Sequence, residues 1–130
     1  MFSSDGILAY SNLDGYYRLV LEVDPELHRY LRGLIPSRFP CKIPRYSPHI
    51  TVVRNEPPIV AENWGKYEGK LVSFTYDPFL NYDGTYWWIK CYSEELILIR
   101  LELGLASSHH HTRPPTDEEC FHSTVGNSKT

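Results

Sequence analysis

Two short stretches of the sequence share a pattern that could carry out acid–base chemistry. His49 and Thr51 occur in SPHITVVR, and His122 and Thr124 occur in CFHSTVGN. Both stretches read His-x-Thr-Val and are expected to be extended. Alternate side chains of a strand point to the same face, so each histidine would share a face with its threonine. The pattern predicts that two imidazoles and two hydroxyls converge in one groove.

A pair of facing histidines suits a reaction in which one proton is removed and another is delivered. The ordinary pKa of imidazole is about 6.5, so near neutral pH one ring can be a base while the other is a protonated acid. Attack of water or a ribose hydroxyl on a phosphodiester needs both transfers. The threonine hydroxyls and nearby backbone N–H groups could hold the non-bridging phosphate oxygens as charge develops. This chemistry demands no metal, and the sequence does not assign the base and the acid.

The first motif ends a strand–helix–strand order in the chain. GYYRLVLEV is rich in aromatic and β-branched residues with rough alternation, which predicts a strand. Asp24 and the proline after it supply an N-cap and a first-turn proline, so a helix is expected over residues 25–32, ended by Gly33. A connection with four prolines follows, and the chain is extended again at the motif.

The second half of the chain repeats this order. LVSFTYDPF and TYWWIKCYS predict two strands joined by a hairpin around Asp83 and Gly84. Ser93 followed by two glutamates is typical of a helix start, and Gly104 favours a helix end after LILIRLELGL, although its apolar residues partly alternate. A polar loop leads to the second motif. Each half is therefore a β-α-β unit whose last strand carries the motif.

The two motifs, PHITV and FHSTV, resemble the paired H-x-T/S-x motifs of the 2H (two-histidine) phosphoesterase superfamily. Its members include RNA 2′,3′-cyclic phosphodiesterases, eukaryotic 2′,5′-oligoadenylate phosphodiesterases and phage anti-CBASS nucleases that cut cyclic oligonucleotide signals. The resemblance extends in architecture from about residue 15 to residue 127 and rests in sequence on the two motifs. It implies that His49 and His122 are the acid/base pair and that the hydroxyls of Thr51 and Thr124 bind the phosphate.

The expected fold is α+β, with two β-α-β lobes related by pseudo-twofold symmetry and antiparallel sheets around a central cleft. A chain of 130 residues fits a single domain and is too short for two independent cores. We therefore expect one 2H phosphoesterase-like domain over residues 1–130. Its lobes would cover about residues 15–56 and 70–127.

Four further residues are candidates for binding the substrate. Tyr17 and Trp88 could stack on a base, although each could instead pack in the core. Lys90 shares a face with Trp88 and could contact a phosphate or lie on the surface. Arg45 belongs to a window, residues 28–54, that contains no acidic residue and could steer an anionic ligand or form a solvated basic face. The basic residues of this window are Arg29, Arg32, Arg38, Lys42, Arg45 and Arg54.

Other histidines and the cysteines give no further site. Three adjacent histidines, residues 109–111, do not converge as spaced metal ligands do, so an exposed loop is expected there and no metal is predicted. His28 is expected on the surface of the first helix. The three cysteines are widely spaced, which indicates neither a disulfide framework nor a zinc ribbon.

Composition limits the class of protein. Hydrophobic residues make up 42% of the chain, which is typical of a globular protein. The formal net charge of −3 argues against binding of nucleic acid through overall positive charge. No stretch reads as a transmembrane span or a secretory signal. We expect a cytoplasmic protein, in the host cytoplasm if it is viral. It would act on a nucleotide or RNA end without a cofactor, a membrane or an obligate protein partner.

Two alternatives to the metal-independent enzyme stay open. A non-catalytic nucleotide- or RNA-binding module of the same fold would keep the basic window and the aromatic residues, but it would not need two titrating imidazoles. A metal-dependent enzyme would use His49, His122 and the triple-histidine loop. For the enzyme, both 2′,3′-cyclic phosphates and cyclic oligonucleotide signals are possible substrates, because the loops show no readable specificity code.

Overall fold

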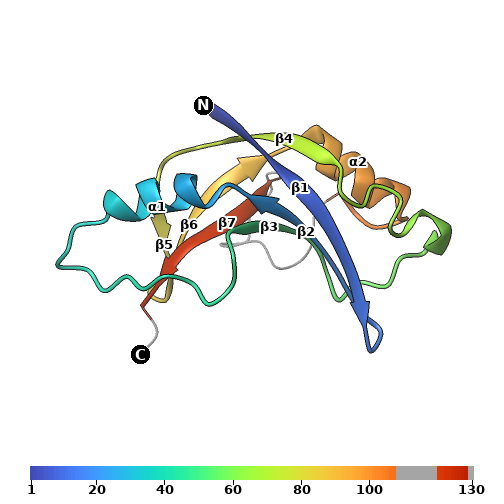
Figure 1. Cartoon of the computed structure of the whole chain (residues 1–130), viewed down its shortest axis with the longest axis horizontal. Coiled ribbons are helices and arrows are strands. Elements are labelled where there is room, and N and C mark those ends of the chain that lie inside the picture. Colours follow the sequence, from blue (N-terminus) through green and yellow to red (C-terminus); the bar gives the residue numbers. More distant parts are fainter. Residues whose placement is uncertain (108–119, 129–130) are drawn as a thin grey trace.

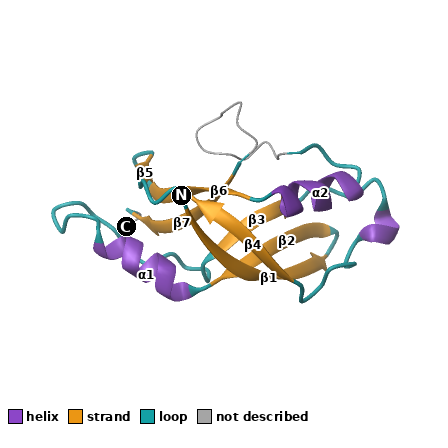
Figure 2. Cartoon of the chain, turned by 90° about the horizontal axis from the view of Figure 1, so that it is seen from above, coloured by secondary structure: helices purple, strands orange, loops and turns teal. Residues whose placement is uncertain are grey.

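The structure of the protein is a computed structural model. Its fold is α+β and is dominated by antiparallel strands (Figures 1 and 2). The structure describes residues 1–107 and 120–128. Its elements in chain order are β1 (Phe2–Leu13), β2 (Tyr16–Val23), α1 (Pro25–Gly33), β3 (His49–Arg54), the short 3₁₀ helix η1 (Ala61–Asn63), β4 (Leu71–Tyr76), β5 (Asn81–Tyr82), β6 (Tyr86–Tyr92), α2 (Glu94–Glu102) and β7 (Phe121–Asn127).

Within the described residues, seven strands form one sheet in the order β4-β1-β2-β3-β7-β6-β5. β4 also pairs with β6, through Thr75 with Tyr92 and Tyr76 with Cys91, so the strands from β4 to β6 close into a ring. α1 contacts β7, whereas α2 contacts β3 and β4. Figure 2 shows the two helices on opposite sides of the crossing strands. The two motif strands, β3 and β7, are therefore neighbours in the sheet and each is contacted by a helix.

The predicted helices are confirmed, and both begin at the predicted caps. The side chain of Asp24 accepts a hydrogen bond from the backbone of Glu26, and that of Ser93 accepts one from the backbone of Leu96. α2 forms despite the alternation in its sequence because Leu96 and Ile99 bury against the sheet. None of the described helices has the length and apolar character needed to cross a membrane.

Strand β1 was not among the predicted strands, and it lies before the expected start of the first lobe. It pairs with β2 along one edge and with β4 along the other. Leu8 contributes its side chain to the core. A Cβ atom at Gly6 would collide with the carbonyl oxygen of Glu22, so glycine permits the close approach of β1 and β2. β1 thus supplies the strand that joins the two halves of the ring.

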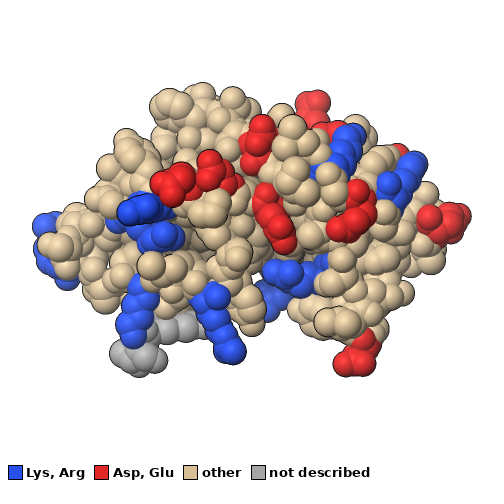
Figure 3. Space-filling model, viewed as in Figure 1, with Lys and Arg blue, Asp and Glu red and all other residues tan. Residues whose placement is uncertain are grey.

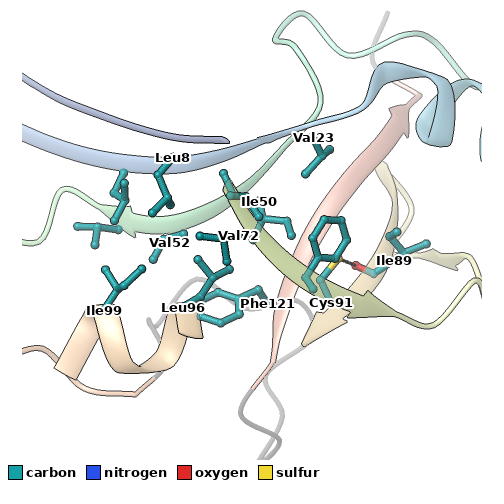
Figure 4. Packing of buried hydrophobic residues seen from close by; sticks show 14 of the residues in the cluster. Leu8, Val23, Ile50, Val52, Val72, Ile89, Cys91, Leu96, Ile99 and Phe121 are labelled. Carbon is teal, nitrogen blue, oxygen red and sulfur yellow. Dashed lines mark hydrogen bonds between the residues drawn. The ribbon is translucent and has the colours of Figure 1, made fainter. Parts of the chain in front are cut away.

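The core fixes which face of β3 and β7 is exposed. Ile50 and Val52 of β3 are buried and lie near Leu96 and Ile99 of α2 in Figure 4. In β7 the middle residue of the motif, Ser123, is also buried. Because successive strand residues point to opposite faces, the histidine and threonine of each motif turn toward the other face.

A buried arginine holds α2 to the end of β3. Arg100 has 0% exposure, and its guanidinium forms an ion pair with Glu56 at 2.8 Å. It also donates to the carbonyl oxygens of Val52 and Ala106 at 2.8 and 2.7 Å. Its buried charge is therefore both paired and hydrogen-bonded, as burial requires.

Candidate active site

The two motifs meet on neighbouring strands. β3 and β7 pair antiparallel at Ile50 and Ser123. Continuing this register by one residue in either direction places each motif histidine opposite the threonine of the other motif. In such a pair, directly opposite Cβ atoms are about 5 Å apart and diagonal neighbours about 7–8 Å apart. The structure thus brings together the four predicted side chains, which are all partly exposed: His49, Thr51, His122 and Thr124.

Strand β6 places two of the predicted substrate-binding residues on this face. Trp88 pairs with Thr124, and Lys90 pairs with His122. Trp88 is only 2% exposed, and its ring packs edge-on to that of His122 with centroids 6.0 Å apart. Its indole N–H is buried and has no hydrogen-bond partner in the part of the chain that the structure describes. Trp88 therefore forms part of the wall behind His122 and offers little area for stacking on a base.

Strand β2 forms the other side of the same face and contributes residues that sequence reasoning missed. Glu22 pairs with His49, and Val20 pairs with Thr51. The sequence pattern that could have identified them is the alternation of Arg18, Val20 and Glu22 with leucines that point into the core. These side chains border a hollow of about 160 Å³. The hollow is lined by Arg18, Val20, Glu22, Tyr46, Ser47 and His49.

The two other predicted substrate-binding residues lie elsewhere. Tyr17 precedes Arg18 and points to the opposite face of β2, where its ring packs edge-on to Trp64 with centroids 5.0 Å apart. The expectation that Tyr17 lines the groove is therefore wrong. Arg45 lies in the exposed segment that joins α1 to β3. No hydrogen bond or ion pair connects Arg45 to the motif residues among residues 1–107 and 120–128.

The hydrogen bond of His49 sets its tautomer. Its Nδ1 lies 2.7 Å from the carbonyl oxygen of Ser47. A carbonyl oxygen only accepts, so Nδ1 carries the proton and the neutral ring keeps its lone pair on Nε2. Burial lowers the pKa of His49, and Arg18 lowers it too, while the Ser47 hydrogen bond and Glu22 act in the opposite direction. Near neutral pH, His49 is favoured as a neutral ring with Nε2 as a proton acceptor.

A third histidine, buried beneath the motif strands, links α1 to both motifs. His28 is 1% exposed, and its Nε2 lies 2.6 Å from the hydroxyl of Ser123. That hydroxyl lies 2.8 Å from the carbonyl oxygen of His49. Because the carbonyl can only accept, the single hydroxyl proton goes to His49 and the hydroxyl accepts from Nε2–H of His28. The expectation that His28 is a surface residue is therefore wrong, since His28 is buried and binds the Ser123 hydroxyl that links the two motif strands.

The buried imidazole of His28 predicts an acid-sensitive fold. Burial, with smaller effects of Arg32 and His49, lowers the pKa of His28 from 6.5 to about 4. Between these values the unfolded chain binds a proton that the folded chain does not, so the free energy of unfolding should fall as the pH drops from about 6.5 to about 4. The shift corresponds to about 3 kcal/mol. Urea unfolding at a series of pH values across this window measures the effect.

The control for this prediction is His28→Gln, which can still donate a hydrogen bond but does not titrate. Its pH dependence should be shallower than that of the wild type. Some dependence should persist, because the pKa of His49 is also lowered and acts in the same direction. An identical slope in both proteins would show that His28 does not cause the acid sensitivity.

The surface charge of the molecule is unevenly distributed, and possible metal ligands do not cluster among the described residues. In Figure 3, Lys and Arg gather on the left and lower parts of the view, over α1 and the segment that joins it to β3. Among the described residues, no three His, Cys, Asp or Glu side chains gather closely enough to hold a metal ion. The triple-histidine segment, residues 109–111, lies outside the described residues.

Comparisons of the chain with protein-family models, curated proteins and solved structures give no match.

Proposed function

We propose that this protein is a metal-independent phosphodiesterase of the 2H type. Its substrates would be cyclic phosphates, either 2′,3′-cyclic phosphate ends of RNA and nucleotides or cyclic oligonucleotide signals. One observation carries the proposal: the two His-x-Thr motifs lie on adjacent antiparallel strands that pair at Ile50 and Ser123. Continued by one residue, this register sets each histidine opposite the other motif's threonine. We expect one phosphate to bind on this face, among the two imidazoles and the two hydroxyls.

The pattern of strand pairing supports a two-lobed origin of the site. β2 pairs with β1 and β3 in the first half, and β6 pairs with β4 and β7 in the second. Between the halves, β3 pairs with β7 and β1 pairs with β4. α1 contacts β7, while α2 contacts β3. Exchanging the two halves leaves these relations unchanged, as a pseudo-twofold axis between β3 and β7 would require.

We assign the base to His49, because its Nδ1–H is committed to Ser47 and its lowered pKa favours the neutral ring. Its Nε2 would take a proton from the attacking water as the water oxygen bonds to phosphorus. His122, as imidazolium, would give its proton to the departing ribose oxygen as the P–O bond breaks. The hydroxyls of Thr51 and Thr124 would donate to the non-bridging oxygens, where negative charge builds.

A product assay tests this function. Protein purified without a histidine tag should hydrolyse at least one substrate when cyclic mononucleotides, an RNA with a 2′,3′-cyclic end and cyclic dinucleotides are compared side by side. The rate should survive EDTA. The plot of kcat/KM against pH should be bell-shaped, with its acidic limb below pH 6.5, because the pKa of His49 is lowered.

Two results would decide for the alternatives. Loss of activity in EDTA, restored by a divalent ion, would favour a metal-dependent enzyme that uses the triple-histidine loop. Binding of nucleotides without product from any substrate would favour the non-catalytic module. An acidic limb above pH 6.5 would contradict the assignment of His49 as the base.

A further inference from the structure

Two arginines lie directly opposite each other on the face of β2 and β3 that carries His49 and Thr51, here called the site face. Arg18 of β2 pairs in register with Arg54 of β3, beyond the pair formed by Val20 and Thr51. Arg18 lines the same hollow as His49, and cross-strand partners point to the same side of a sheet. The face that carries the motif residues therefore continues into a row of two guanidinium groups.

This pairing is unfavourable without an anion. Like charges directly opposite each other destabilise an antiparallel sheet. No ion pair of Arg18 or Arg54 is found among residues 1–107 and 120–128. Glu56 is close to Arg54 in sequence, but both of its carboxylate oxygens accept hydrogen bonds from the buried Arg100, at 2.9 and 2.8 Å. The two guanidinium groups are thus left to a ligand of opposite charge.

The position of the pair suggests which anion it binds. Thr51 and Arg54 flank a bulge in β3, and the row of the arginines lies two residues of β2 beyond that of Thr51, which is about 7 Å along the strand. A phosphate at the arginines is therefore distinct from the one between the histidines. Guanidinium groups bind phosphate oxygens through two parallel hydrogen bonds, and two of them side by side can each donate to the non-bridging oxygens of one phosphate group.

We propose that Arg18 and Arg54 bind a second phosphate of the substrate, next to the phosphate that is attacked. This inference rests on the proposed phosphodiesterase function and narrows its substrate class. A substrate with two or more phosphates, such as an oligonucleotide with a 2′,3′-cyclic end or a cyclic dinucleotide, occupies both positions. A cyclic mononucleotide has one phosphate and occupies only the position between the histidines.

Kinetics on matched substrates test the second position. The wild type should have a higher kcat/KM for the dinucleotide ApA with a 2′,3′-cyclic end than for 2′,3′-cyclic AMP. Arg18→Gln and Arg54→Gln should each lower kcat/KM for the dinucleotide by roughly 10-fold to 100-fold, mainly through KM, as expected for loss of a charged hydrogen bond. The mononucleotide rate should change little in Arg54→Gln. In Arg18→Gln it should change only through the pKa of His49, which Arg18 lowers in the wild type. Equal losses on both substrates, or none on either, would overturn the proposal.

Two control variants separate the effect of the guanidinium pair from a general loss of positive charge. Lys66→Gln removes one positive charge from an exposed residue that pairs with Glu102, away from the site face, and should leave both rates unchanged. Arg18→Lys keeps the charge but loses the planar guanidinium, so it should restore only part of the dinucleotide preference. Because Arg18→Gln and Arg54→Gln relieve repulsion between like charges, their Tm should equal or exceed that of the wild type. A clear fall in Tm would assign their effect to folding.

A binding measurement separates this proposal from the proposed function. The probes are AMP and the linear dinucleotide pApA, neither of which carries a cyclic phosphate. The wild type should bind pApA more tightly than AMP, and this preference should disappear in Arg18→Gln and Arg54→Gln. The slope of log Kd against log salt for pApA should become shallower by about 0.7 for each lost phosphate contact. Arginine-dependent binding of pApA without hydrolysis of any substrate would refute the enzyme and keep the second phosphate position. Hydrolysis without a preference for pApA would do the reverse.

Discussion

His49→Ala and His122→Ala should each lower the rate of hydrolysis by roughly 10²-fold or more, because each removes one of the two proton transfers. Both side chains are partly exposed and lie outside the core. The variants should therefore keep a Tm close to that of the wild type. Steady-state kinetics with the best substrate from the product assay measure the effect. Lys66→Gln, far from the reacting groups, serves as the control for preparation and handling.

The pH profiles of the two variants distinguish their roles. His49→Ala should lose the acidic limb of the kcat/KM profile, because that limb reports protonation of the base. His122→Ala should lose the alkaline limb, where the acid is deprotonated. In the double variant the loss should be much smaller than the product of the single losses, since the two groups act as one unit. Unchanged hydrolysis in both single variants would refute the proposed function.

The orientation of the motif residues was predictable, whereas their register was not. The period of two in a strand places His49 and Thr51 on one face, and Ile50 between them is apolar and goes to the core. The pairing of Ile50 with Ser123 is a contact between distant segments, and no local pattern specifies it. β1 was missed for a similar reason: its serines, aspartate and glycine favour no element locally, and it is fixed by pairing with β2 and β4.

The predicted substrate-binding residues show where a local sequence pattern misled the prediction. In YYRLVLEV the aromatic residues drew attention to Tyr17, but burial of the leucines puts Tyr17 on the core side and Arg18 on the site face. His28 could not be placed from the helix alone, because its partner Ser123 lies 95 residues further along the chain. In both cases a long-range contact decided which side a polar residue faces.

The other large effect is expected at the contact between α1 and the motif strands. Ser123→Ala removes the hydroxyl that donates to the carbonyl of His49 and accepts from Nε2–H of His28. A buried donor and a partly buried acceptor then lose their partner. A buried donor or acceptor without a partner costs about 1–3 kcal/mol, so the free energy of unfolding should fall by about 2–3 kcal/mol. Because His49 is the residue whose backbone is released, the rate of hydrolysis should fall as well.

A double-mutant cycle with His28→Leu tests whether the imidazole and the hydroxyl act together. Nδ1 of His28 is buried without a hydrogen-bond partner in the part of the chain that the structure describes, so leucine removes two polar atoms from a buried position. When both partners are replaced by apolar groups the cost should be smaller than the sum of the single losses, with a coupling of about 1–2 kcal/mol. Urea unfolding of the four proteins measures it. Additive losses would show that the two groups do not interact, and α1 would then contribute to the site only by covering it.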